Sequence, residues 1–96
     1  MRKAYYIECK TFVDSGHGFN MMAADMGTMP TIATSKKQGE KRYYKMIETY
    51  NNLLNYKTTK EYTLDEIGVG ICLAKTELHH KSLGHITFIS LYEIWI

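Results

Sequence analysis

The sequence predicts an α+β domain in which a small, mostly antiparallel sheet of three to four strands packs on one main helix. Three observations predict it: a helical periodicity at about residues 36–55, and alternating or continuous apolar residues at 3–13 and 86–96. We expect the order β-(β)-α-β-β. Ninety-six residues suffice for one modest core, so residues 1–96 are expected to form a single domain.

The main helix is predicted from its start signal and its apolar stripe. Ser35 and Gln38 have the spacing of a capping box, in which each side chain satisfies a free backbone N–H of the other residue. The apolar residues that follow recur at helical spacing and are expected to face the sheet: Tyr43, Met46, Ile47, Tyr50, Leu53 and Leu54. The other face is basic and carries Lys36, Lys37, Lys41, Arg42 and Lys45, with Tyr44 among them.

Residues 3–13 are predicted to form a half-buried strand. Tyr5, Ile7 and Cys9 alternate with mostly polar neighbours, with Tyr6 and Phe12 as apolar exceptions. The strand ends in the Gly-containing turn Asp14–Gly18. Beyond it, Asn20 is placed to cap one helical turn that runs from Met21 to Met26.

Four methionines crowd together at Met21, Met22, Met26 and Met29. Methionine adapts to irregular apolar surfaces, so this cluster either fills the gap between helix and sheet or contacts a partner.

Several shorter segments complete the prediction. Residues 30–34 fit a short edge strand, and residues 56–63 read as a polar connector. Thr63 and Glu66 form a second capping-box pattern, but two nearby glycines would cost a helix roughly 2 kcal/mol. We therefore expect at most one helical turn there, followed by a strand from about residue 67 to residue 78. Residues 79–84 are expected to form a hairpin loop.

The final strand, at residues 86–96, is apolar on both faces. One face holds Ile86, Phe88, Tyr92, Ile94 and Ile96, and the other holds Ile89, Leu91 and Trp95. Because one helix cannot cover both faces of a sheet, either the methionine-rich segment or another molecule is expected to cover the second face.

Composition and charge exclude several protein classes. The chain is 45% hydrophobic and 23% charged, which is typical of a folded globular protein. The net charge of +2 is uneven: residues 1–60 hold ten Lys and Arg against five Asp and Glu, whereas residues 61–96 hold two against five. No secretory signal or membrane span is predicted, and two reduced cysteines, Cys9 and Cys72, are expected in a cytoplasmic protein.

Two small groups of residues are candidates for chemical sites. His79, His80 and His85 could bind zinc, with Cys9 or Cys72 as a fourth ligand, but adjacent residues of a strand point to opposite faces. Solvated loop histidines are the preferred interpretation, and neither a metal nor a cofactor is expected. Gly16, His17 and Gly18 form a weak anion-binding pattern, and His17 has no partner spaced to make it a general acid or base.

These observations favour a non-enzymatic interaction protein, such as a viral or mobile-element accessory protein or inhibitor, that docks on a partner protein or forms a homodimer. The expected partner-binding residues are Met21, Met22, Met26, Lys37, Lys41, Arg42, Tyr44, Lys45 and Trp95. The alternative is a nucleotide- or nucleic-acid-binding module that uses the basic helix and the Asp14–Gly18 loop. An enzyme is the third option, because no catalytic constellation is visible.

Overall fold

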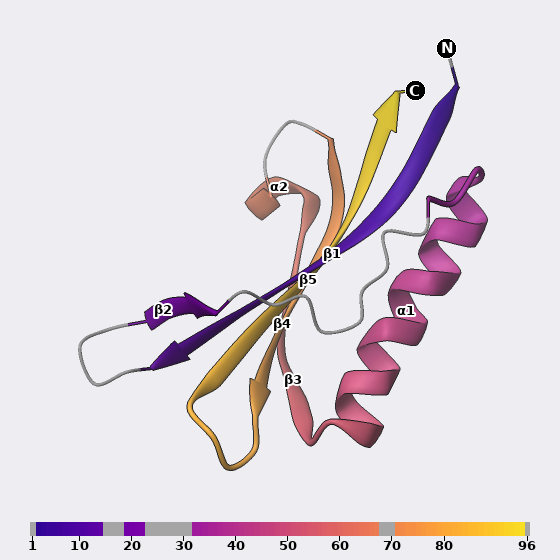
Figure 1. Ribbon diagram of the computed structural model, residues 1–96. Helices are drawn as coiled ribbons and strands as arrows, with labels where there is room; N and C mark the ends of the chain where they lie inside the picture. The colour runs from indigo at the N-terminus through magenta and orange to yellow at the C-terminus, as the bar shows by residue number, and fades with distance from the viewer. Residues whose placement is uncertain (1, 15–18, 23–31, 68–70, 96) are drawn as a thin grey trace.

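Antiparallel strands form one sheet, and a long helix packs on one of its faces (Figure 1). The computed structural model describes residues 2–14, 19–22, 32–67 and 71–95. Its elements are β1 (Lys3–Asp14), β2 (Phe19–Met22), α1 (Lys36–Leu53), β3 (Tyr56–Tyr62), α2 (Leu64–Ile67), β4 (Cys72–His80) and β5 (His85–Trp95). Neither α1 nor α2 has the length and apolar character needed to cross a membrane.

The predicted fold class, an antiparallel sheet on one main helix, is confirmed, and the described residues contribute five strands in the order β2-β1-β5-β4-β3. The strand β5 lies in the centre. It pairs with β1 over almost its whole length, from Lys3 opposite Trp95 to Val13 opposite His85. On its other side β5 pairs with β4.

Local interactions determine both ends of the helix α1. The Ser35 hydroxyl accepts a hydrogen bond from the backbone N–H of Gln38 at 3.2 Å, which confirms the predicted N-cap. At the other end, Asn55 has a φ of 63°, in the left-handed region where Asn is tolerated better than most residues. The helix therefore ends at Leu53, two residues before the predicted boundary.

The core lies between α1 and the sheet. Tyr43, Ile47 and Tyr50 on the helix are buried with Ile89 and Leu91 on β5. This confirms most of the predicted stripe.

The prediction that the last two residues of the apolar stripe face the sheet is wrong. Leu53 is 78% exposed and Leu54 is 36% exposed. At about 100° per residue, Leu53 falls at the margin of the buried face, in the last turn of the helix. Neither leucine belongs to the core.

Two strands form where the sequence predicted other structure. Residues 19–22 pair with the end of β1 as β2, so the helical turn expected from Asn20 is wrong at its start, and its remainder lies outside the described residues. Residues 56–62 pair with β4 as β3, where a connector was expected. Pairing to a neighbouring strand outweighs the weak local preference of polar segments such as Tyr56–Tyr62.

Other boundaries also shift. Of the edge strand expected at residues 30–34, the described part forms one bridge, between Tyr5 and Ala33. The strand β4 begins at Cys72 and not near residue 67, and it extends to His80, so His79 and His80 lie in a strand and not in a loop.

The predicted single helical turn after Thr63 is present as α2. The Thr63 hydroxyl accepts from the backbone N–H of Glu66 at 3.3 Å, and the Glu66 carboxylate accepts from the backbone N–H of Thr63 at 3.2 Å. This reciprocal pair is the capping box expected from the sequence. The turn lies on the side of the sheet opposite α1 (Figure 1).

The two faces of β5 differ in burial. Ile89 and Leu91 are covered by α1 and are 0% and 1% exposed, whereas Trp95, on the same face, is 58% exposed at the end of the strand. On the second face, Phe88 and Tyr92 are half-buried and contact the rings of Phe12 and Tyr6 on β1. Only part of the apolar sheet surface is therefore left for contact with another molecule.

Candidate functional site

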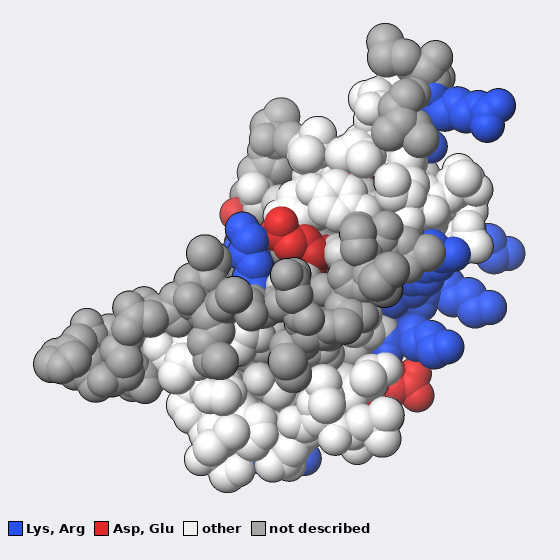
Figure 2. Space-filling view, in the orientation of Figure 1, with Lys and Arg blue, Asp and Glu red and all other residues white. Residues whose placement is uncertain are grey.

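Basic side chains gather along the solvent side of α1. We call Lys36, Lys37, Lys41, Arg42 and Lys45 the basic helix face. Figure 2 shows blue side chains along the right of the molecule, where Figure 1 places α1. The four lysines are exposed and Arg42 is half-buried. The structure therefore brings together the helical part of the predicted partner-binding set.

The lysines of the basic helix face have no ion-pair partner within the described part of the chain. Ion pairs form elsewhere, at Lys3 with Glu93, Lys10 with Glu8, and Lys60 with Glu66. The first turn of α1 contains no acidic residue, although the helix dipole favours acids there.

This arrangement lowers stability. Lys37, Lys41 and Lys45 follow one another at a spacing of four residues, so each stands beside a like charge on the helix surface. Repulsion of this kind and cations near a helix N-terminus each cost a few tenths of a kcal/mol. Glu40 and Glu48, each three or four residues from a lysine of this face, offset part of this cost. The basic helix face therefore adds little to the stability of the fold.

Tyr44 lies at the edge of this face and is 60% exposed. Its ring contacts that of the buried Tyr43 edge-to-face, with ring centres 5.3 Å apart. A pocket of about 110 Å³ opens beside the two rings and is lined also by Glu61 and Tyr62 of β3 and by Ala74, Lys75 and Thr76 of β4. An exposed aromatic ring and a pocket therefore adjoin the basic helix face.

Tyr43 is fixed within the wall of this pocket. Its hydroxyl hydrogen-bonds the hydroxyl of Thr76, and both residues are buried. Burial raises the pKa of Tyr43 to about 12, although the hydrogen bond with Thr76 acts in the opposite direction. The Tyr43 phenol is therefore neutral at physiological pH, and its ring packs against that of Tyr44.

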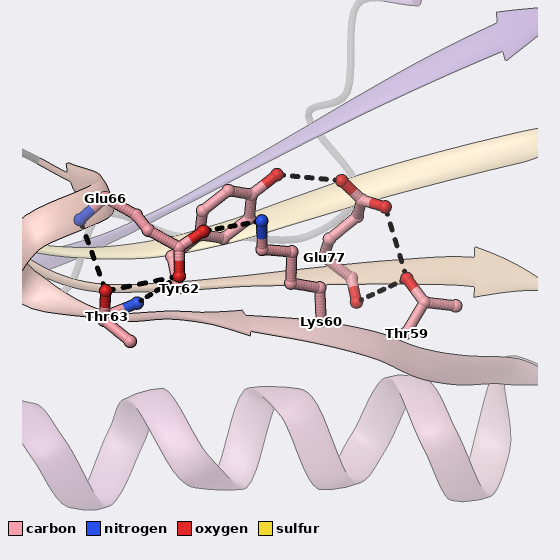
Figure 3. A network of polar contacts seen from close by, with 6 residues as sticks. All are labelled: Thr59, Lys60, Tyr62, Thr63, Glu66 and Glu77. Atoms are coloured by element: carbon pink, nitrogen blue, oxygen red, sulfur yellow. Dashed lines mark hydrogen bonds and ion pairs between the residues drawn. The ribbon is translucent and has the colours of Figure 1, made fainter.

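A polar network ties β3 to β4 and to α2 (Figure 3). Glu77 accepts hydrogen bonds from the hydroxyls of Tyr62, at 2.9 Å, and Thr59, at 3.3 Å, and it lies 2.8 Å from His79. Burial raises the pKa of Glu77, but the bonds with His79 and Tyr62 more than offset this, so the pKa lies below its ordinary value. The network leaves Glu77 ionised and holds the β3 edge in place.

Lysine and aromatic side chains contact one another on the side of the sheet opposite α1. The Lys60 ammonium lies 4.5 Å from the centre of the Tyr62 ring and 2.6 Å from the Glu66 carboxylate. Lys75 lies 5.2 Å from the Tyr62 ring and 4.9 Å from the Phe88 ring. These lysines, unlike those of α1, already have partners.

Trp95 is not part of the basic helix face. It lies at the end of β5 opposite Lys3, whose ammonium is 5.3 Å from the centre of its ring. Met21 and Met22 lie on β2, which pairs with Thr11 and Phe12, near the other end of β1. The predicted set is therefore spread over at least three places, and Met26 lies outside the described residues.

The other sites considered in the sequence are the Gly16–Gly18 loop, the three histidines and the two cysteines. Gly16, His17 and Gly18 lie outside the described residues. His80 contacts His85, with ring centres 5.9 Å apart, while His79 pairs with Glu77. No group of three potential metal ligands occurs among the residues that the structure describes. Cys9 and Cys72 are both free.

Tyr62, Ala74 and Lys75 were not predicted as site residues from the sequence. Tyr62 lies in residues 56–63, which were expected to be a connector, whereas Ala74 and Lys75 lie in the predicted strand at 67–78 and carry no functional pattern of their own. Tyr56 and Tyr62, near the two ends of the expected connector, have high strand propensity, although the register shift between Thr58 and Lys60 places them on opposite faces of the sheet. That signal could have indicated β3.

Comparison with known proteins gives no precedent: no family model matches the sequence, and neither a characterised protein nor a solved structure matches significantly.

Proposed function

We propose that this chain is a non-enzymatic docking domain whose basic helix face binds an acidic surface of a partner protein. One observation carries the proposal. Lys36, Lys37, Lys41 and Lys45 are exposed and have no ion-pair partner among the described residues. The helix dipole disfavours Lys36 and Lys37 in the first turn, and mutual repulsion disfavours the row Lys37, Lys41 and Lys45. An acidic partner would supply the missing counter-charges.

The neighbouring side chains suit a protein partner. Tyr and Arg are enriched at the centres of protein interfaces, and Tyr44 and Arg42 stand among the lysines. The lysines would steer an acidic surface towards the helix, and the exposed Tyr44 ring would supply apolar contact. An accessory or inhibitory protein that works by covering a partner's surface needs no catalytic group.

The proposal is tested by charge reversal with a matched control. Lys41→Glu with Lys45→Glu reverses two charges on the helix, while Lys57→Glu with Lys81→Glu makes the same change in net charge on exposed residues of β3 and of the β4–β5 loop. Affinity capture from extracts of the source cells, before and after nuclease treatment, is compared for the three proteins.

We expect the unchanged chain and the control variant to retain one protein partner in stoichiometric amount after nuclease treatment, and the helix variant to lose it. Equal capture by the helix variant and the control would contradict the proposal. Recovery of nucleic acid alone would favour the second candidate.

That second candidate is nucleic-acid binding by the same helix. The row of lysines beside an exposed ring could contact phosphates and stack on a base. Its test is binding of a labelled oligonucleotide at rising salt, since phosphate contacts make affinity fall steeply with ionic strength. Lys41→Glu with Arg42→Glu should abolish that binding, and no binding at low salt rules the candidate out.

A further inference from the structure

We infer that the pocket beside Tyr44 receives a tyrosine side chain from an acidic segment of the partner. The inference rests on the proposed function and specifies what the partner presents. The pocket lies between α1, β3 and β4 and has a volume of about 110 Å³. For comparison, a closed cavity of roughly 150 Å³ holds a benzene molecule. A pocket that opens to solvent can hold most of one aromatic ring.

The pocket lies where β4 is irregular and carries a small side chain. The register between β4 and β5 shifts between Cys72 and Ala74, which marks a β-bulge, and bulges recur beside functional sites. Ala74 lines the pocket together with Tyr43, and its side chain is a single methyl group. Since Tyr43 is held by Thr76, the side chain at this wall is already ordered before a guest arrives.

The walls favour an aromatic guest with a hydroxyl group. The exposed ring of Tyr44 offers a surface for stacked or edge-to-face contact with a second ring. Glu61, at the pocket and exposed, offers a carboxylate that can accept a hydrogen bond from a phenol. The lysines of the basic helix face outnumber Glu61 beside the pocket and disfavour a cationic guest.

The pocket is placed where an acidic segment would pass. Successive helix residues are rotated by about 100°, so Tyr44 projects between the buried Tyr43 and the solvent-facing Lys41 and Lys45. A segment whose carboxylates contact these lysines therefore runs beside Tyr44. A tyrosine within that segment reaches the pocket without leaving the basic helix face.

The experiment uses the full chain and synthetic acidic peptides that are identical except for a central Tyr, Phe, Ala or Arg, with binding measured by calorimetry at low salt. We expect the Tyr peptide to bind roughly tenfold more tightly than the Ala peptide. Ala74→Leu, which fills the pocket, and Glu61→Gln, an exposed change that removes the charge, should each reduce this preference. Leu83→Ala, in the exposed β4–β5 loop, is the control and should leave it unchanged.

The outcomes separate this inference from the proposed function. If Lys41→Glu with Lys45→Glu weakens all four peptides while Tyr and Ala peptides bind equally, docking stands and the pocket assignment is overturned. A Phe or Arg peptide that binds as tightly as the Tyr peptide overturns it as well. If the charge reversal changes no peptide's affinity, the proposed function itself fails.

Discussion

At the scale of single residues, Gly39 decides how closely α1 approaches the sheet. A Cβ atom at this position would lie 2.8 Å from the Cβ of Tyr5 and 3.4 Å from a methyl group of Leu91. Contacts of 2.8 Å between carbons are too short, and the neighbouring atom belongs to a buried residue next to the backbone. A glycine within a helix, which local propensity disfavours, is therefore explained by packing.

We expect Gly39→Ala to lower the free energy of unfolding by about 1–2 kcal/mol. Overpacking of a core typically costs about 1–3 kcal/mol, and this exceeds the gain in helix propensity of up to about 1 kcal/mol. Urea unfolding measures the change. Asn52→Ala, at an exposed position of the same helix, is the control and should be neutral or stabilising; an equally stabilising Gly39→Ala would show that the helix can move away from Tyr5.

Buried tyrosines make stability depend on alkaline pH. Burial raises the pKa of Tyr43 from 10.0 to about 12 and also raises that of Tyr50. Because the folded pKa exceeds the unfolded one, this contribution is fully present below pH 10 and is lost as the pH rises towards 12. Urea midpoints measured from pH 8 to pH 12 should therefore fall above pH 10, and a constant midpoint up to pH 12 would contradict the burial of these phenols.

At the scale of elements, the sequence predicted what local chemistry determines. The N-cap at Ser35 and the capping box at Thr63 and Glu66 depend on neighbours in the chain, and both were found where expected. The strands β2 and β3 depend on pairing with β1 and β4, and this pairing outweighs the local preference of either segment.

The candidate site was predictable in part for the same reason. The basic helix face follows from helical periodicity alone. The pocket needs Glu61 on β3, the bulge at Ala74 and Tyr44 on α1 to meet, and no local pattern encodes that meeting.

The β3 edge depends on Glu77, whose pKa lies below its ordinary value. Since the folded pKa is the lower one, the carboxylate stabilises the protein above pH 4.5 and this contribution is lost as the pH falls further. We expect Glu77→Gln to cost about 1–2 kcal/mol at pH 7, because Tyr62, Thr59 and His79 lose a charged acceptor. Thermal unfolding at pH 7 and pH 3 measures this, and Glu48→Gln, exposed on α1, should change little; a Glu77→Gln effect equally large at pH 3 would contradict the role of the charge.

At the scale of the whole molecule, charge and apolar surface are divided between the two sides of the sheet. On the α1 side, the core is closed by Tyr43, Ile47 and Tyr50 while the lysines face solvent. On the other side, Lys60 and Lys75 are engaged with rings and carboxylates. Lys57 and Lys81 are also exposed and without an ion pair among the described residues, but α1 gathers such lysines in one row and is therefore favoured as the docking side. The homodimer expected from the sequence stays a prediction.

The most direct test of this account is lysine footprinting of the free chain and of its complex with the captured partner. Acetylation rates of individual lysines are compared by mass spectrometry. The account predicts strong protection of Lys37, Lys41 and Lys45 in the complex, with Lys57 and Lys81 unchanged. Protection of Lys57 and Lys81, with the three helix lysines as reactive as in the free chain, would contradict docking through α1.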